Sequence, residues 1–302
     1  MTKKSGNWLI LLLLIPTAVI LAIAGLLIFQ ELQPLPPIQP LPHPNGYNDL
    51  MQAGEMVSTN SWNYEAMDEA QLRETVSANA EALSLVRAGL SNECRVPIQF
   101  SLAYSGRHLS ELVGLRRLAQ AFMAEGKFAE KQGRFSDAAG FYLDLIRLGN
   151  DSARGGVLID AMVGLAIENM GLAGLQKITD RLDAKSCREA AATLETLDAQ
   201  RQSWADILQQ ENAWSRRTFN SLGYKIYRPL MAKMTKKAFQ SAGQKFKEQQ
   251  TKTRQLLIDL AARAYELDKG HHPASPADLV PDYLKAVPQD PLTGTNLVYS
   301  PR

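Results

Sequence analysis

The sequence lacks the short motifs that mark common catalytic and metal-binding sites. It contains no G-x-S-x-G, no H-E-x-x-H and no glycine-rich phosphate loop. The adjacent residues His271 and His272 have no cysteine or carboxylate at ligand spacing on a nearby predicted helix. We therefore predict no catalytic residue, no cofactor and no metal ion. A hydrolase whose site converges from distant residues remains an alternative.

Cysteine is scarce, with Cys94 and Cys187 as the only two. Two cysteines are too few for a disulfide scaffold. Two interpretations stay open: one disulfide between Cys94 and Cys187 that closes a long loop, or two buried free thiols that pack like small apolar side chains. The sequence does not decide between them, because it gives no distance between the two residues.

The chain has one long run of hydrophobic residues, at positions 8–29, with no charged residue. As a helix this run would span ~33 Å, enough to cross a hydrocarbon core of ~30 Å. Lys3 and Lys4 precede it, which favours a cytoplasmic amino terminus. A signal peptide cleaved after Ala24 is the alternative, but the run continues past that point. We predict a cytoplasmic tail (residues 1–7), a transmembrane helix (8–29) and an extracytoplasmic remainder.

A proline-rich linker is predicted over residues 30–46. Six prolines occur between Pro34 and Pro44. Such composition favours extended polyproline II at ~3.1 Å per residue. The linker is either a spacer that holds the body away from the bilayer or a tether without fixed geometry.

Residues 47–270 carry the pattern of a helical body. Apolar residues recur at steps of three and four, whereas the alternating patterns typical of strands are scarce before residue 290. Asn150 is expected to cap a helix that runs to Ile178. We predict a mainly α fold, with a helical-bundle body over residues 47–270.

One segment of this body, residues 119–148, resembles a single tetratricopeptide repeat. Gly126, Gly133, Phe135, Ala138 and Tyr142 occupy the small and aromatic positions of that family. The resemblance implies a helical hairpin. One copy does not form the binding groove of a solenoid, because about three repeats are needed to bury a continuous core.

Acidic residues are nearly absent between Trp214 and Arg254, where Glu248 is the only one among eleven lysines and arginines. The block has a net charge of +10, which leaves −8 for the rest because the whole chain carries +2. Basic amphipathic helices bind anionic membranes or acidic partners. The alternative is a solvated face whose cations pair with the acidic remainder. The predicted basic contact face consists of Arg216, Arg217, Lys225, Arg228, Lys233, Lys236, Lys237, Lys245 and Lys247.

Residues 271–302 form the predicted tail. A short helix near Asp278, the turn Pro288-Gln-Asp290-Pro291, Gly294 and a strand ending at Tyr299 follow one another. This order resembles the carboxy-terminal module of type II secretion pseudopilins, which implies a small α/β tail. In that family the region can hold calcium, and Asp290 would be the matching carboxylate, but one carboxylate does not make a calcium site.

The complete order of anchor, linker, helical body and tail resembles a group of bacterial membrane-anchored proteins of unassigned function. The resemblance implies a single-pass protein of the cell inner membrane. We predict a non-enzymatic scaffold or partner-binding protein outside the cytoplasm, with an anionic lipid surface or another envelope protein as partner. No nucleic-acid partner is expected, and the sequence gives no oligomeric state. A component of a secretion or pilus-like apparatus is the alternative function.

Overall fold

The computed structural model describes residues 34–58, 63–219 and 222–298, together with seven residues between positions 14 and 25. The chain divides into a smaller unit, residues 1–39 with 219–236, and a larger unit, residues 40–218 with 237–302. The expected cytoplasmic tail and most of the expected transmembrane helix lie outside the described residues.

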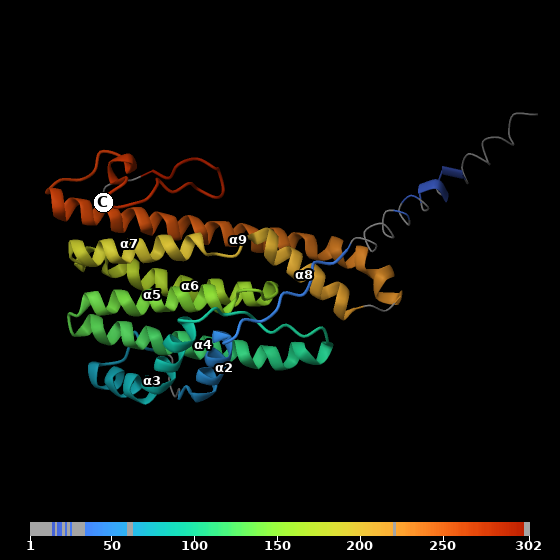
Figure 1. The fold of residues 1–302 in the computed structure, drawn as a ribbon, viewed down its shortest axis with the longest axis horizontal. Coiled ribbons are helices and arrows are strands. Elements are labelled where there is room, and N and C mark those ends of the chain that lie inside the picture. The colour runs from blue at the N-terminus through green and yellow to red at the C-terminus, as the bar shows by residue number, and fades with distance from the viewer. Residues whose placement is uncertain are drawn as a thin grey trace, which may run out of the picture. The chain divides into compact units, whose positions relative to one another are not determined.

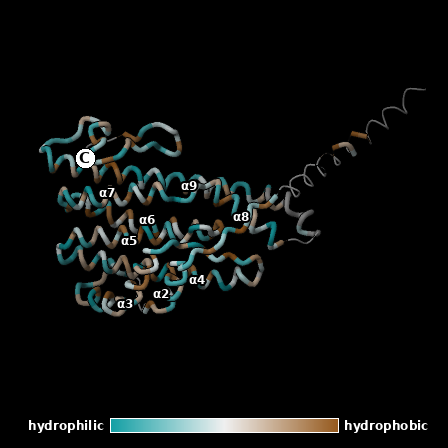
Figure 2. The backbone as a smooth tube through the Cα atoms, in the orientation of Figure 1, coloured by the Kyte–Doolittle hydropathy of each residue, from teal (hydrophilic) through white to brown (hydrophobic). Residues whose placement is uncertain are grey.

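The fold is mainly helical, as the sequence predicts (Figure 1). The larger unit packs its helices side by side: α3 contacts α2 and α4, and α5 contacts α4, α6 and α7. Each of these helices has both hydrophobic and hydrophilic residues along its length (Figure 2). In chain order the elements are α2 (Gly46–Met56), α3 (Glu69–Leu90), α4 (Leu102–Lys131), α5 (Phe135–Ser152), α6 (Leu158–Ile178), the 3-10 helix η1 (Thr179–Arg181), α7 (Ala184–Ala199), α8 (Trp204–Thr218), α9 (Leu222–Lys269) and the 3-10 helix η2 (Pro276–Leu279).

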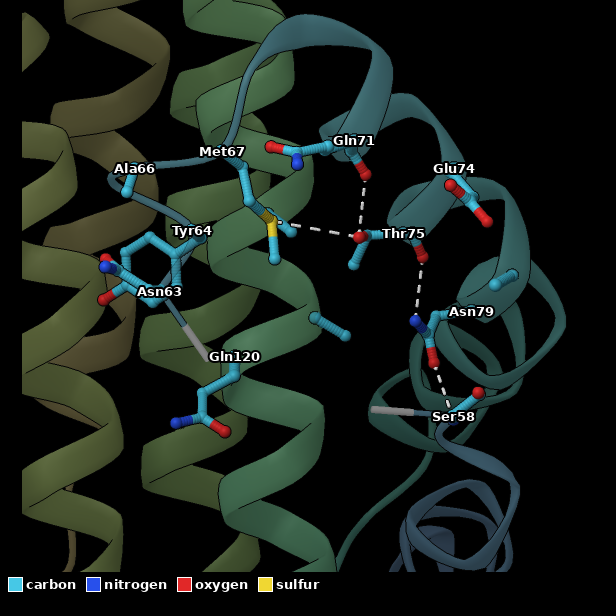
Figure 3. Close-up of a pocket in the computed structure, with 13 residues that line it drawn as sticks. Ser58, Asn63, Tyr64, Ala66, Met67, Gln71, Glu74, Thr75, Asn79 and Gln120 are labelled. Atoms are coloured by element: carbon cyan, nitrogen blue, oxygen red, sulfur yellow. Dashed lines mark hydrogen bonds between the residues drawn. The ribbon is translucent and has the colours of Figure 1, made fainter. Parts of the chain in front are cut away.

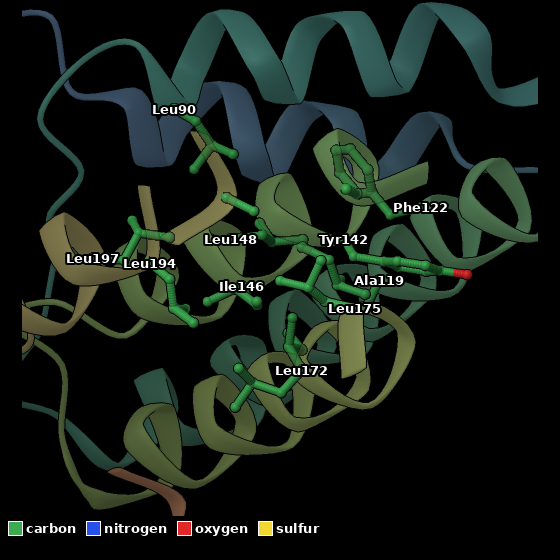
Figure 4. Packing of buried hydrophobic residues seen from close by; sticks show 14 of the residues in the cluster. Leu90, Ala119, Phe122, Tyr142, Ile146, Leu148, Leu172, Leu175, Leu194 and Leu197 are labelled. Atoms are coloured by element: carbon green, nitrogen blue, oxygen red, sulfur yellow. The ribbon is translucent and has the colours of Figure 1, made fainter. Parts of the chain in front are cut away.

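The contact between α5 and α6 is unusually close because glycines face each other across it. A Cβ atom added at Gly164 would lie 2.4 Å from the carbonyl oxygen of Gly149, so only glycine fits there. Ile146 of α5 packs near Leu172 and Leu175 of α6, and all three are buried (Figure 4). These two helices form the centre of the hydrophobic core.

Helix α6 is also apolar enough to be considered as a membrane span. Among the described residues, the stretch Leu158–Arg181 alone has the length and composition to cross a membrane, with a mean hydropathy of 1.4. Half of that window is buried inside the fold. Its glycine contacts with α5 are those of a core helix.

The helix expected from Asn150 to Ile178 is wrong at its start. The structure ends α5 at Ser152 and begins α6 at Leu158. Gly155 between them has a φ of +72°, a left-handed conformation that a right-handed helix does not contain. The two glycines of the sequence therefore break the segment into two helices.

The helical hairpin expected over residues 119–148 is present, because α4 and α5 are joined by a short turn at Gly133. Gly126 of α4 faces the ring of Tyr142 on α5, where an added Cβ would lie 2.4 Å from a ring carbon. The small residue thus makes room for the aromatic one. The resemblance to a tetratricopeptide repeat remains a prediction.

The tail packs on the larger unit. Leu279 is fully buried and Leu284 is 2% exposed, and both belong to the main hydrophobic cluster. On α9, the Arg254 guanidinium donates to the carbonyl oxygen of Gln289 over 2.6 Å. The Thr251 hydroxyl donates to Asp290 Oδ1 over 2.8 Å. Asp290 therefore holds the tail against α9.

The predicted α/β character of the tail is not found. Residues 271–298 contain the 3-10 helix η2 and a single β-bridge between Gln289 and Asn296, but no strand. Leu297 is partly buried and packs against the main cluster. The apolar residues that suggested a strand instead contact the helical core.

Candidate functional site

The predicted basic face lies on α8 and α9, and its members differ in their surroundings. Arg216 and Arg217 are half-buried in the last turn of α8. The Arg217 guanidinium lies 5.1 Å from the centre of the Phe100 ring. Lys225 and Arg228 lie in α9, but their side chains are outside the described part of the chain.

The five lysines of α9 between Met231 and Glu248 are exposed and form no ion pair with any described residue. They share one helix, so their spacing follows from the helical repeat. Steps of three, four, eleven and fourteen residues place most of them along one stripe. We call this set the α9 lysine stripe, and it consists of Lys233, Lys236, Lys237, Lys245 and Lys247.

Several arginines elsewhere are paired with acids, in contrast to these exposed lysines. The Arg201 guanidinium lies against the Glu168 carboxylate, and the two side chains are 5% and 1% exposed. Arg254 Nε lies 2.7 Å from Asp198 Oδ2. The expectation that the basic block pairs with the acidic remainder therefore holds for Arg254 but not for the α9 lysine stripe.

An apolar stripe runs along another side of α9. Met231, Met234, Ala238, Ala242 and Phe246 follow one another at steps of three and four residues. Phe246 and Ala242 are buried, whereas Met231 is 46% and Met234 69% exposed. Ala242 and Phe246 thus pack within the larger unit, whereas Met231 and Met234 belong to the smaller unit and are exposed.

The two cysteines are free thiols and both are buried. Cys94 follows the end of α3 and lies close to Gly46, whereas Cys187 lies on α7. Burial raises the pKa of each thiol to about 12. Of the two interpretations left open by the sequence, the structure therefore has two packed free thiols and no disulfide between Cys94 and Cys187.

A buried histidine cluster was missed by the sequence interpretation. His108 Nε2 lies 2.5 Å from Asp160 Oδ1, and His108 Nδ1 lies 2.8 Å from Glu111 Oε2. Tyr104 stacks on the imidazole with ring centres 4.8 Å apart. His108 and Asp160 are 3% and 1% exposed, whereas the Glu111 side chain is 37% exposed, so the cluster reaches solvent on the Glu111 side. The signal available was the i, i+3 spacing of His108 and Glu111 on α4, but Asp160 comes from α6.

The cluster joins helices through a positive charge. Carboxylate oxygens only accept hydrogen bonds, so the imidazolium, which donates from both nitrogens, satisfies both contacts. Burial lowers the pKa of His108, but Asp160 and Glu111 outweigh burial and raise the pKa above its ordinary value. The Tyr47 hydroxyl of α2 also donates to Glu111, over 3.4 Å. The cluster therefore links α2, α4 and α6.

A hollow of about 490 Å³ lies between α3, α4 and the segment before α3 (Figure 3). Asn63, Tyr64, Glu74 and Gln120 are among the residues that line it. The described residues contain no group of three or more histidine, cysteine or acidic side chains that could hold a metal ion.

Comparison of the chain with family models, with curated proteins and with solved structures found no match.

Proposed function

We propose that the protein is a membrane-anchored, non-enzymatic scaffold outside the cytoplasm that docks on an anionic lipid surface through α9. The α9 lysine stripe carries this proposal. Its five cations are exposed, have no acid within ion-pair distance among the described residues, and share a helix with the exposed Met231 and Met234.

The chemistry of this surface matches anionic headgroups. Each lysine near an anionic membrane contributes about 1 kcal/mol, and the attraction acts over a Debye length of ~8 Å at physiological salt. Amphipathic helices bury their apolar residues at the boundary of headgroups and acyl chains. Met231 and Met234, which are exposed on the same stretch of α9 as the lysines, are available for this contact.

The apolar run at residues 8–29 supports the location. We take it as a single-pass anchor with the amino terminus inside, in the inner membrane. Leu14, Ile15 and Val19, the large apolar residues described there, are each more than half exposed. A linker of eleven residues from Pro34 to Pro44 would reach ~34 Å as polyproline II. Such a tether keeps the body near the bilayer and raises its effective concentration there.

The test is co-sedimentation of residues 34–302 with vesicles, once circular dichroism has shown that the shortened chain keeps its helix content. Vesicles that contain phosphatidylglycerol should bind it, and vesicles of phosphatidylcholine alone should not. The variant K233Q/K236Q/K237Q should bind roughly 100-fold more weakly, since it loses three contributions of about 1 kcal/mol. Binding should also fall steeply between low and physiological salt.

The matched control is K177Q/K185Q/K269Q, which removes the same charge from three exposed lysines outside the basic block. It should bind like the wild type. Equal binding by both triple variants would reduce the effect to net charge and contradict a specific lysine face. Absence of vesicle binding, with cross-linking of α9 to an envelope protein, would replace the lipid with a protein partner.

A further inference from the structure

Helix α4 is longer than α3, which packs beside it, and α3 covers only part of its length. Arg87 of α3 pairs with Glu125 of α4. Arg73 of α3 lies over the ring of Phe128, with 5.8 Å between the guanidinium carbon and the ring centre. Both contacts are in the second half of α4, so α3 lies beside that half (Figure 1). The outer side of the first half is therefore left exposed.

This outer side of α4 combines apolar and cationic side chains. Leu109 and Val113 are one turn apart and are 55% and 50% exposed. Arg116 and Arg117 follow in the next turn, are exposed, and form no ion pair with another described residue. At about 100° per residue, the two arginines lie on either side of the line through Leu109 and Val113. We call these four residues the α4 patch.

The exposed side of α3 carries the opposite charge. Glu74 and Glu81 are exposed and form no ion pair with another described residue. Their separation of two turns places them on one stripe of the helix, together with the exposed Ala78 and the half-buried Leu85. We call these four residues the α3 patch. It is the acidic counterpart of the α4 patch, because each has two unpaired charges beside two apolar side chains.

The two patches border the same hollow but do not neutralise each other within one chain. Glu74 and Ala78 line the hollow from α3, and Gln120, one turn after Arg116, lines it from α4. The Glu74 carboxylate is directed away from Gln120 (Figure 3). The patches extend over about 12 Å of α4 and about 17 Å of α3, at 1.5 Å per residue. They are thus of similar length and adjoin one side of the α3–α4 pair.

We infer that a second copy of this chain packs on this side, with the α4 patch of each copy on the α3 patch of the other. A two-fold axis makes this contact twice and closes the assembly as a dimer. Leu109 and Val113 would be covered at the centre of each contact and the charges would lie at its rim, which is the usual arrangement of interfaces.

The combination of both charges favours a second copy over other occupants. An anionic bilayer would attract Arg116 and Arg117 but repel the carboxylates of Glu74 and Glu81 on the neighbouring helix. A foreign acidic helix would pair with the arginines and leave these carboxylates unmatched. A second copy matches both patches at once. The inference does not depend on the lipid-docking proposal, because α9 contributes no residue to either patch.

Sedimentation velocity of the full chain in an uncharged detergent tests the dimer. The wild type should be dimeric at micromolar concentration and low salt. R116E/R117E and E74R/E81R should each dimerise at least about tenfold more weakly, because like charges then face each other. An equimolar mixture of these two variants should form a dimer with one copy of each. The quadruple variant, which exchanges the charges of both patches, should dimerise again. Both rescues would show that the variants are folded.

The matched control is K131E/K269E, which makes the same change in charge at two exposed lysines outside the patches. It should dimerise like the wild type. The inference is overturned if the wild type is monomeric, or if R116E/R117E dimerises as tightly as K131E/K269E. A mass that keeps rising beyond the dimer with concentration would contradict two-fold closure. A monomeric wild type that binds anionic vesicles through Arg116 and Arg117 would assign the α4 patch to lipid.

Discussion

Two stretches of α9 belong to the same helix but meet different surroundings. From Met231 to Lys247 the helix is largely exposed, and its lysines form no ion pair among the described residues. From Gln249 to Lys269 most of the apolar side chains are buried, with Leu267 as an exposed exception, and Arg254 and Arg263 are paired with acids. Both stretches are helical throughout. The difference shows that packing on the larger unit, rather than the helix itself, decides where charge must be matched.

In the second stretch, two buried polar residues interrupt the apolar stripe of α9. They are Gln249 and Thr253, which are 6% and 1% exposed. The Thr253 hydroxyl donates to Glu168 Oε1 over 3.0 Å. Arg201 lies against the same carboxylate. The interruption at Thr253 is therefore a buried polar contact that joins α6, α9 and Arg201, which lies two residues after the end of α7.

The largest effect is expected from Arg201→Met, which leaves the Glu168 carboxylate buried without its cation. Removing one partner of a buried ion pair costs about 3–5 kcal/mol. Denaturant unfolding followed by circular dichroism measures the loss. The double variant R201M/E168L is the control and should recover most of the stability. A double variant as unstable as the single one would show that the shape of the site, not its charge, is what matters.

A pair of apolar truncations compares the two stretches directly. Leu260 is fully buried and Met234 is 69% exposed. Leu260→Ala should lower the free energy of unfolding by about 2–5 kcal/mol, whereas Met234→Ala should change it by less than about 0.5 kcal/mol. Equal losses in thermal melts would mean that Met234 is packed against part of the chain.

The buried histidine gives a pH-dependent effect of intermediate size. The pKa of His108 is raised in the folded state, so its contribution is fully present below the unfolded value of about 6.5 and is lost as the pH rises through the folded pKa. Chemical denaturation across this range should show falling stability for the wild type. His108→Gln should be less stable at acidic pH and flatter with pH. A wild type and a variant with parallel pH profiles would contradict the imidazolium assignment.

The smallest effect on stability is expected from K233Q/K236Q/K237Q. Exposed side chains without partners change the free energy of unfolding by less than about 0.5 kcal/mol. Because neighbouring like charges repel, the melting temperature should stay level or rise slightly at low salt. A clear destabilisation would reveal a structural role for these lysines and weaken the proposal that they serve a partner.

The helical class, the hairpin and the long helix could be predicted because each depends on local spacing. The apolar steps of α3, α4 and α9 and the turn at Gly133 are visible in short windows. The glycine at position 155, where the helix breaks, is visible in the sequence, but the segment around it was interpreted as part of one continuous helix.

The sites could be predicted only in part. The lysines of α9 were found from composition, but whether they were paired depended on how far Asp198 and other acids lie from them. His108 needs Asp160, which is 52 positions away. The hollow is lined by residues of α3, α4 and the segment before α3, and no short window of the sequence shows that they lie side by side. Whether the apolar tail residues form a strand or pack on the helical core could not be predicted, because the sequence does not show which surface they contact.

The burial of both thiols has a practical consequence for following α9 in the membrane. With a pKa of about 12 and almost no exposure, Cys94 and Cys187 would contain little thiolate at neutral pH. A cysteine introduced at Gln240 would therefore be the thiol that reacts fastest with a maleimide or a spin label. Spectroscopic probes can be attached to α9 of the native sequence without first replacing the two cysteines that its core needs.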